Sequence, residues 1–310
     1  MNPPTLLAAS HISYRLRDRP LVDDIDLTVG RGEVLGLLGV NGAGKTTTLR
    51  MIAGVLAPTT GSVLIEGSDL FEQPELARRC IGYLPERPPL HDELTIDEYL
   101  GFCARLRGIA RNQVAAAVIV AMESCDLVQQ RQRLIGSLSQ GFRQRVGIAQ
   151  AIVHQPDLVV LDEPAAGLDP VQALALRELI GTLAKSRAVI LSTHLLNDVT
   201  ACCDHIAILH HGRLRYSARL DALARQDVQR VVVGRDLAMV DWLSLPEVIA
   251  AEPAARRNWR VQLSPRADLA GLAASIVARG WGMTELRPDH PALDAIFLDI
   301  ALSPALDDAA

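Results

Sequence analysis

A stretch of eight residues in this 310-residue chain has the types and spacing that wrap a phosphate tail. It fits the pattern of a glycine, four residues and then Gly-Lys-Thr, and it runs Gly39-Val40-Asn41-Gly42-Ala43-Gly44-Lys45-Thr46. The glycines let successive backbone N–H groups converge on phosphate oxygens, Lys45 reaches the terminal phosphates, and the Thr46 hydroxyl can bind Mg²⁺. The predicted nucleotide contacts in this loop are Gly39, Asn41, Gly42, Ala43, Gly44, Lys45, Thr46 and Thr47.

Two adjacent carboxylates and a histidine supply further candidate chemistry. Asp162 and Glu163 follow the apolar run 158–161, and the next residue is a proline, which stops a strand. Asp162 can hold Mg²⁺, directly or through water, while Glu163 can accept a proton from an attacking water. His194 comes just after the predicted strand 188–192. Ligands of open α/β sheets bind at the carboxyl ends of strands, so this histidine is a catalytic candidate.

The flanking elements are those that such a site needs. Residues 33–38 form a short apolar run typical of a buried parallel strand, and residues 46–53 predict a helix directly after the loop. Residues 6–15 and 24–29 alternate polar and apolar types and predict antiparallel strands. Further elements are predicted as strands at 62–65 and 81–84, helices at 95–106, 114–125, 141–154 and 171–183, and a hairpin at 206–217. A capping box, Thr95 with Glu98, opens the first of these helices.

The composition, net charge and cysteine count narrow the class of protein. A hydrophobic content of 49% supports a large core and more than one domain, and a net charge of -5 without a basic stripe speaks against nucleic-acid binding. The longest apolar stretches, 114–122 and 269–278, are too short for a membrane helix of about 20 residues. No secretory signal is visible, and five cysteines without Cys-x-x-Cys spacing fit a reducing cytoplasm better than disulfides or zinc.

Residues 5–220 resemble an ATP-binding-cassette (ABC) transporter ATPase subunit, in the branch of exporters whose membrane subunits are separate chains. The resemblance rests on five motifs in the family's order and approximate spacing: the phosphate loop, Leu138-Ser139-Gln140-Gly141-Phe142 at the signature position, Asp162-Glu163, Gly167-Leu168-Asp169 and His194. It implies an α/β P-loop NTPase fold with a RecA-like core, an antiparallel β subdomain and a helical subdomain at about 87–155, within an ATP-binding domain of residues 1–222.

The same resemblance implies Mg-dependent ATP hydrolysis by a head-to-tail homodimer. ATP would lie between the phosphate loop of one copy and the signature of the other. Glu163 matches the general base, His194 the switch residue at the terminal phosphate, and Tyr14 the aromatic that stacks on the base. On chemistry alone, Tyr14 is equally well explained as a strand aromatic.

Two departures from the family pattern bear on the site. Gln140 and Phe142 replace a glycine and a glutamine of the usual Leu-Ser-Gly-Gly-Gln signature. Ser139 and Gly141 remain, so a hydroxyl and a backbone N–H at a helix start can still meet a phosphate. The lid position, usually glutamine, is Glu86, which we include with Thr46 and Asp162 as a candidate Mg²⁺ ligand.

Residues 225–310 predict a small α+β accessory domain. The expected order is strand, helix, strand, strand, helix, strand, a split βαβ layout, followed by a last helix at about 292–302. Similar C-terminal domains occur in the exporter branch, where they serve dimer contact or regulation.

The leading functional hypothesis is an ATP hydrolase on the cytoplasmic face of the cell membrane, powering export through a separate multi-span permease. Leu90, Leu94, Tyr99 and Phe102 are candidate docking residues for that permease, although a core role explains several of them equally well. One alternative is a soluble cassette ATPase acting on nucleic acid or ribosomes. Another, a metabolic phosphotransferase, would leave the signature and the Gly167-Leu168-Asp169 motif without a role.

Overall fold

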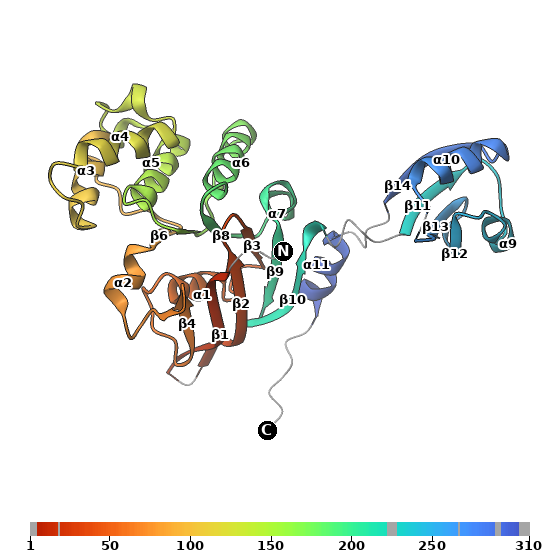
Figure 1. The fold of residues 1–310 in the computed structure, drawn as a ribbon, viewed down its shortest axis with the longest axis horizontal. Coiled ribbons are helices and arrows are strands. Elements are labelled where there is room, and N and C mark those ends of the chain that lie inside the picture. The colour runs from red at the N-terminus through yellow and green to blue at the C-terminus, as the bar shows by residue number, and fades with distance from the viewer. Residues whose placement is uncertain (1–4, 18, 222–227, 266, 289–292, 304–310) are drawn as a thin grey trace. The chain divides into compact units, whose positions relative to one another are not determined.

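The computed structural model describes residues 5–17, 19–221, 228–265, 267–288 and 293–303 (Figure 1). The chain divides into two compact units, residues 1–218 together with 300–310, and residues 219–299. The predicted domain boundary at residues 222–225 lies outside the described residues. None of the described helices combines the length and the apolarity needed to cross a bilayer.

A six-stranded sheet forms the centre of the first unit. Its strands, in sheet order, are β10 (Arg213–Arg219), β9 (His205–His210), β3 (Val34–Leu38), β8 (Ala188–Thr193), β7 (Leu158–Leu161) and β6 (Ile81–Leu84). β3 pairs in parallel with both β8 and β9, and β7 pairs in parallel with β6 and β8. The strands predicted from the apolar runs are therefore confirmed, and those that carry the candidate chemistry are neighbours.

The central strands are apolar throughout because both faces of the sheet are buried. In β7, Leu158 and Val160 belong to one hydrophobic cluster, while Val159 and Leu161 belong to another. The first cluster includes apolar residues of α1 (Lys45–Ile52) and of the antiparallel strands, and the second includes residues of the helices described below. Adjacent residues of one strand thus hold the sheet between two cores.

The antiparallel sheet covers one of these faces. Its order is β2 (Arg19–Gly30), β1 (Thr5–Leu16), β4 (Thr60–Ile65) and β5 (Ser68–Asp69). The short helix α2 (Pro74–Arg79) follows, and it was not predicted. The pairing of β1 with β2 shifts register at several points, so the side chains of β1 do not keep a single alternation between the faces.

Helices build the other face. They are α3 (Ile96–Leu106), α4 (Val114–Ser124), α5 (Gln140–Ile152), α6 (Pro170–Ala184) and α7 (Leu196–Cys202), with 3₁₀ turns at Val128–Gln130 and Ile135–Ser137. Figure 1 shows α3, α4 and α5 gathered into one group, which corresponds to the predicted helical subdomain. The capping box that opens α3 is confirmed: Thr95 Oγ1 accepts from Glu98 N at 3.3 Å, and Glu98 Oε2 accepts from Thr95 N at 2.9 Å.

The second unit has the predicted order of elements. They are β11 (Val228–Val233), α9 (Met239–Leu243), β12 (Val248–Ala255), β13 (Asn258–Leu263), α10 (Leu269–Ala278) and β14 (Met283–Pro288). The sheet order β12-β13-β11-β14, with antiparallel neighbours, is the ferredoxin-like arrangement. Its core includes Trp242, whose ring lies 5.0 Å from that of Trp281 and 5.9 Å from that of Trp259. The last helix, α11 (Leu293–Leu302), has its residues from Ile300 onward in the first unit.

A substitution at Gly82 in β6 tests whether α5 must pack closely against this strand. A Cβ at this position would collide with the carbonyl oxygen of Ala151, which is backbone and cannot swing aside. We expect Gly82→Ala to lower the free energy of unfolding by about 1–3 kcal/mol, measured by urea denaturation. Gly181 in α6 is the matched control, because nothing lies within 4 Å of its added Cβ. Gly181→Ala should stabilise the protein by about 0.5–1 kcal/mol, and a loss equal to that of Gly82→Ala would contradict the packing argument.

Candidate functional site

The candidate residues converge because their strands are neighbours in one parallel sheet. β3 leads into the phosphate loop, β7 into Asp162 and Glu163, and β8 into His194, so all three loops lie at the carboxyl edge of the sheet. A cavity of about 460 Å³ opens there. It is lined by Leu21, Asn41, Gly42, Ala43, Gly44, Lys45, Thr46, Thr47, Glu86, Glu163, Ala166 and His194.

Two glycines of the loop are required by close packing and by backbone conformation. A Cβ on Gly39 would lie 2.6 Å from the carbonyl oxygen of Leu209 in β9. Gly44 precedes α1 with a φ of 103°, a conformation that other residues rarely adopt. The loop therefore closes tightly and leaves the first turn of α1 facing the cavity, where a phosphate can use its free N–H groups.

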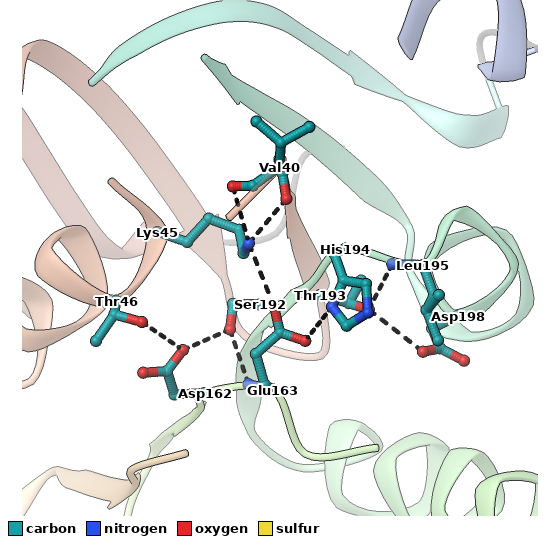
Figure 2. Close-up of polar contacts among 11 residues, drawn as sticks. Val40, Lys45, Thr46, Asp162, Glu163, Ser192, Thr193, His194, Leu195 and Asp198 are labelled. Carbon is teal, nitrogen blue, oxygen red and sulfur yellow. Dashed lines mark hydrogen bonds and ion pairs between the residues drawn. The ribbon is translucent and has the colours of Figure 1, made fainter. Parts of the chain in front are cut away.

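Lys45, Glu163 and His194 form a chain of charged contacts in the cavity (Figure 2). The Nζ atom of Lys45 donates to the carbonyl oxygen of Gly39 at 2.8 Å and lies 3.2 Å from Oε1 of Glu163. The other carboxylate oxygen of Glu163 accepts from Nδ1 of His194 at 2.9 Å. The side chains of Lys45 and Glu163 are only 7% and 12% exposed, so little water weakens their attraction.

Asp162 is held by hydroxyl groups from helix α1 and strand β8. Its Oδ1 atom accepts from the Ser192 hydroxyl at 2.7 Å and from the Thr46 hydroxyl at 3.2 Å (Figure 2). Ser192 Oγ also accepts from the backbone N–H of Glu163 at 2.8 Å. The residue is fully buried, and its Oδ2 atom has no hydrogen-bond partner among the described residues. A buried carboxylate oxygen without a partner, beside a threonine hydroxyl, is a donor set that fits Mg²⁺.

Burial dominates the electrostatics of Asp162. Loss of water raises the pKa of its carboxyl, the hydrogen bonds from Ser192 and Thr46 lower it, and the nearby charges of Glu163 and Glu86 raise it again. The net direction is upward. Because burial makes this carboxylate costly to ionise, a nearby cation would stabilise its charged form.

Glu86 and Tyr14 have different placements. Glu86 lines the cavity, and its role as a lid residue stays a prediction. Tyr14 does not; it is half-buried in β1 and packs against the hydrophobic cluster beneath the antiparallel sheet. Leu21 lines the cavity instead, next to Val22, which pairs with Tyr14. The structure therefore does not bring Tyr14 to the nucleotide cavity, and base stacking by this residue stays a prediction.

The signature residues Ser139 and Gly141 do not lie in the phosphate-loop cavity. Ser139 precedes α5, and both residues line a separate cavity of about 180 Å³ between α5 and α6, together with Phe142, Gln144 and Gln172. A Cβ on Gly141 would lie 2.5 Å from Oε1 of Gln172, so this glycine lets α6 approach closely. The phosphate-loop residues and the signature residues of one chain thus line two different cavities.

Three residues of the site were missed by reasoning from sequence: Leu21, Ala166 and Ser192. The first two carry no chemical signal. Ser192, a polar residue at the carboxyl end of a predicted apolar strand, could have been found as a ligand-edge residue. Asp198 of the unpredicted helix α7 also supports the site, because it accepts from Arg177 at 2.7 Å and from Thr193 at 3.3 Å beside His194.

Comparison of the sequence and the structure with those of known proteins gives the same family each time. Residues 22–166 match the family described as ABC transporter. The ABC transporter ATP-binding protein NatA of Bacillus subtilis (strain 168) is 36% identical over 70% of this chain and 91% of its own. The bacitracin transport ATP-binding protein BcrA of Bacillus licheniformis is 35% identical over 72% of each. A solved structure described as the ATP binding subunit of an ABC transporter matches with a TM-score of 0.64 and 34% identity, covering 72% of this chain and 93% of that one.

Asp162 generates a prediction about pH. Because its pKa in the folded state is raised, the charged form destabilises the fold once the pH exceeds the ordinary aspartate value of about 4. Without nucleotide or Mg²⁺, Asp162→Asn should therefore increase the free energy of unfolding at pH 7, and the gain should vanish as the pH falls below about 4. Urea titrations at several pH values measure this. The argument would be contradicted if Asp162→Asn were less stable than wild type at pH 7 and the difference in the free energy of unfolding did not change with pH. Burial would then not be what determines the pKa of Asp162.

Proposed function

Because the chain belongs to the ABC transporter family, as an ATP-binding subunit that hydrolyses ATP, we propose that it powers export through a separate membrane permease. ATP would close a head-to-tail dimer, and hydrolysis would release it. The observation that carries this proposal is the separation of the two half-sites: Lys45 lines one cavity, while Ser139 and Gly141 line another. A second copy can supply the missing half.

Lys45 and Glu163 would exchange partners when ATP binds. In the structure Lys45 pairs with Glu163, and a terminal phosphate entering the cavity competes for the same ammonium group. Glu163, released from Lys45 and still in reach of His194, can then accept the proton of the attacking water. His194 would contact the terminal phosphate. Lys45 and the loop N–H groups would balance its developing charge.

Thr46, Asp162 and Glu86 are the residues that would hold Mg²⁺. The first two are linked by a hydrogen bond of 3.2 Å, and Glu86 lines the same cavity. When bound, Mg²⁺ would neutralise phosphate charge and orient the phosphate tail. Ser192 would keep Asp162 in place through its 2.7 Å hydrogen bond.

The export branch is supported by the departures at Gln140, Phe142 and Glu86, which resemble those of exporters with separate membrane subunits. A place on the cytoplasmic face of the membrane, in contact with the permease, follows from that assignment. The named relatives are transporter proteins, including one named for bacitracin transport, and nothing favours the nucleic-acid alternative.

The candidate docking surface is smaller than the sequence suggested. Tyr99 is 2% exposed and donates its hydroxyl to the carbonyl oxygen of Pro89 at 3.1 Å, so it is a core residue. Leu90 and Leu94 are partly buried against the same core. Phe102 is 40% exposed, and its ring lies 6.3 Å from that of His91. Phe102 and His91 thus form the exposed part of this surface.

We further propose that residues 225–310 are an accessory module that nucleotide binding does not need, because every phosphate-site motif precedes residue 195. A folded chain ending at Asp221 that fails to bind ATP would refute this assignment.

The dimer model predicts the behaviour of a base-deficient variant. Glu163→Gln keeps the shape of the side chain but loses the proton acceptor, so turnover should fall about 10²–10⁴-fold while ATP binding persists. The variant should accumulate as an ATP-bound dimer, measured by light scattering. Lys45→Ala, which removes the fixed counter-charge, should stay monomeric under the same conditions. A monomeric Glu163→Gln protein saturated with ATP would contradict dimer closure.

The transport role predicts a separation of activities at Phe102. Phe102→Asp places a charge on the exposed docking surface, away from the nucleotide cavity. We expect basal ATPase activity to persist while co-purification with the membrane subunit and transport are lost. Val55→Asp, at a 62% exposed position that lies outside α3, is the control. Unchanged transport and co-purification in the Phe102 variant would place the permease contact elsewhere.

A further inference from the structure

Helix α4 is apolar on nearly every side, yet the described part of the chain covers only one side of it. Its sequence, Val-Ala-Ala-Ala-Val-Ile-Val-Ala-Met-Glu-Ser, contains one charged residue, Glu123. A helix that is apolar all round is normally buried all round. In this structure only Val118, Ala121 and Met122 are buried. Ile119 and Val120 are each 42% exposed, so the outer side of α4 is an uncovered apolar surface.

A groove between α3 and α4 borders that surface. It has a volume of about 550 Å³ and an apolar floor that includes Val114, Val118 and Ile119 from α4. α3 contributes Gly101, which lacks a side chain, and Arg105 one turn later. None of the residues that line this groove lines the phosphate-loop cavity or the signature cavity. By helical spacing, Arg105 lies three residues after Phe102 and is its neighbour on the surface of α3, so this groove adjoins the Phe102 surface.

The rim of the groove carries unbalanced positive charge. Three arginines line it, and the only carboxylate among its described lining residues is Asp97, which pairs with Arg131 at 3.0 Å. The guanidinium groups of Arg105 and Arg111 make no hydrogen bond or ion pair with another described residue. Two guanidinium groups therefore stand free beside an apolar floor.

We propose that this groove, defined by Gly101, Arg105, Arg111, Val118, Ile119 and Arg131, binds an acidic amphipathic helix of a partner protein. The apolar side of such a helix would cover the floor and the outer side of α4. Its carboxylates would pair with the two free arginines, whose planar groups suit two-point contact with carboxylate. Binding there does not require the nucleotide cavity, with which the groove shares no lining residue.

The shape and chemistry of the groove favour a peptide over other anions. A lipid headgroup layer is flat, whereas this site is concave and offers apolar surface to inserted side chains. Single-stranded nucleic acid is usually held by aromatic stacking, and none of the described residues that line the groove is aromatic. Alternating carboxylates and apolar side chains match the rim and the floor together.

Gly101 allows the groove to be filled without changing its charge. An added Cβ would have only Nη1 of Arg105 within 4 Å, at 3.5 Å, and this is the end of a flexible side chain. Gly101→Leu should therefore fold, and it gains helix propensity of up to about 1 kcal/mol. The double variant Arg105→Glu with Arg111→Glu reverses the charge instead and leaves the floor intact. Arg79→Glu, at an exposed arginine of α2, is a charge-reversal control outside the groove.

The test uses the full chain and a fluorescent synthetic helix with leucines at helical spacing and glutamates between them, titrated by anisotropy. We expect binding to wild type and to Arg79→Glu, at least about tenfold weaker binding to both groove variants, and weakening with salt. A peptide with lysine in place of glutamate should not bind. ATPase activity of the groove variants should equal that of wild type, which separates this result from a failure of the nucleotide site.

Three outcomes would overturn the proposal. The acidic peptide could fail to bind wild type, or it could bind the groove variants as tightly as wild type. In a parallel arm with phosphatidylglycerol vesicles, binding that is lost in both groove variants, without peptide binding, would assign the groove to a lipid surface instead.

Discussion

The ion pair between Lys45 and Glu163 is the interaction on which the site depends. At 3.2 Å and nearly out of contact with water, neither charge can be left alone without a large cost. In the proposed reaction, a phosphate that binds at Lys45 would therefore compete with Glu163 for the ammonium group. The sheet makes this possible, because β3 and β7 flank β8 and bring a cation and an anion from distant parts of the chain to one edge.

Ser192 positions both Asp162 and Glu163 through hydrogen bonds. Its hydroxyl donates to Asp162 and accepts from the backbone N–H of Glu163. Glu163 adopts a φ of 47°, a left-handed conformation that is unfavourable for a residue with a side chain. Strain of this kind persists only where surrounding contacts hold it, and it collects at functional sites. The hydrogen bond from Glu163 N to Ser192 is one such contact, and it points the carboxylate toward Lys45 and His194.

Much of the fold and the centre of the site could be predicted, because their signals are local. The phosphate loop needs glycines at fixed spacing, and β7 is apolar throughout because it faces two cores. It was harder to predict which way a side chain points and which side of a helix is covered by its neighbours. Tyr14 packs against the core while Leu21 lines the cavity, and the register shifts on both sides of Tyr14 mean that simple alternation along the sequence does not indicate its facing. The helix α7 is short, so its sequence shows little periodicity. α4 is apolar on every side, and its composition does not indicate which side a neighbour covers.

The division of β7 between two cores also constrains how such a chain can change length during evolution. Successive side chains of a strand point to opposite faces of the sheet. Deleting one residue from β7 would therefore turn the side chains beyond the deletion to the opposite face, so that Val159 and Leu161 would point to the cluster that Leu158 and Val160 now contact. The same deletion would draw Asp162 back by about 3.3 Å and rotate it away from Thr46. Insertions and deletions should therefore be found among descendants in the connections between strands, while the lengths of β3, β7 and β8 are inherited unchanged.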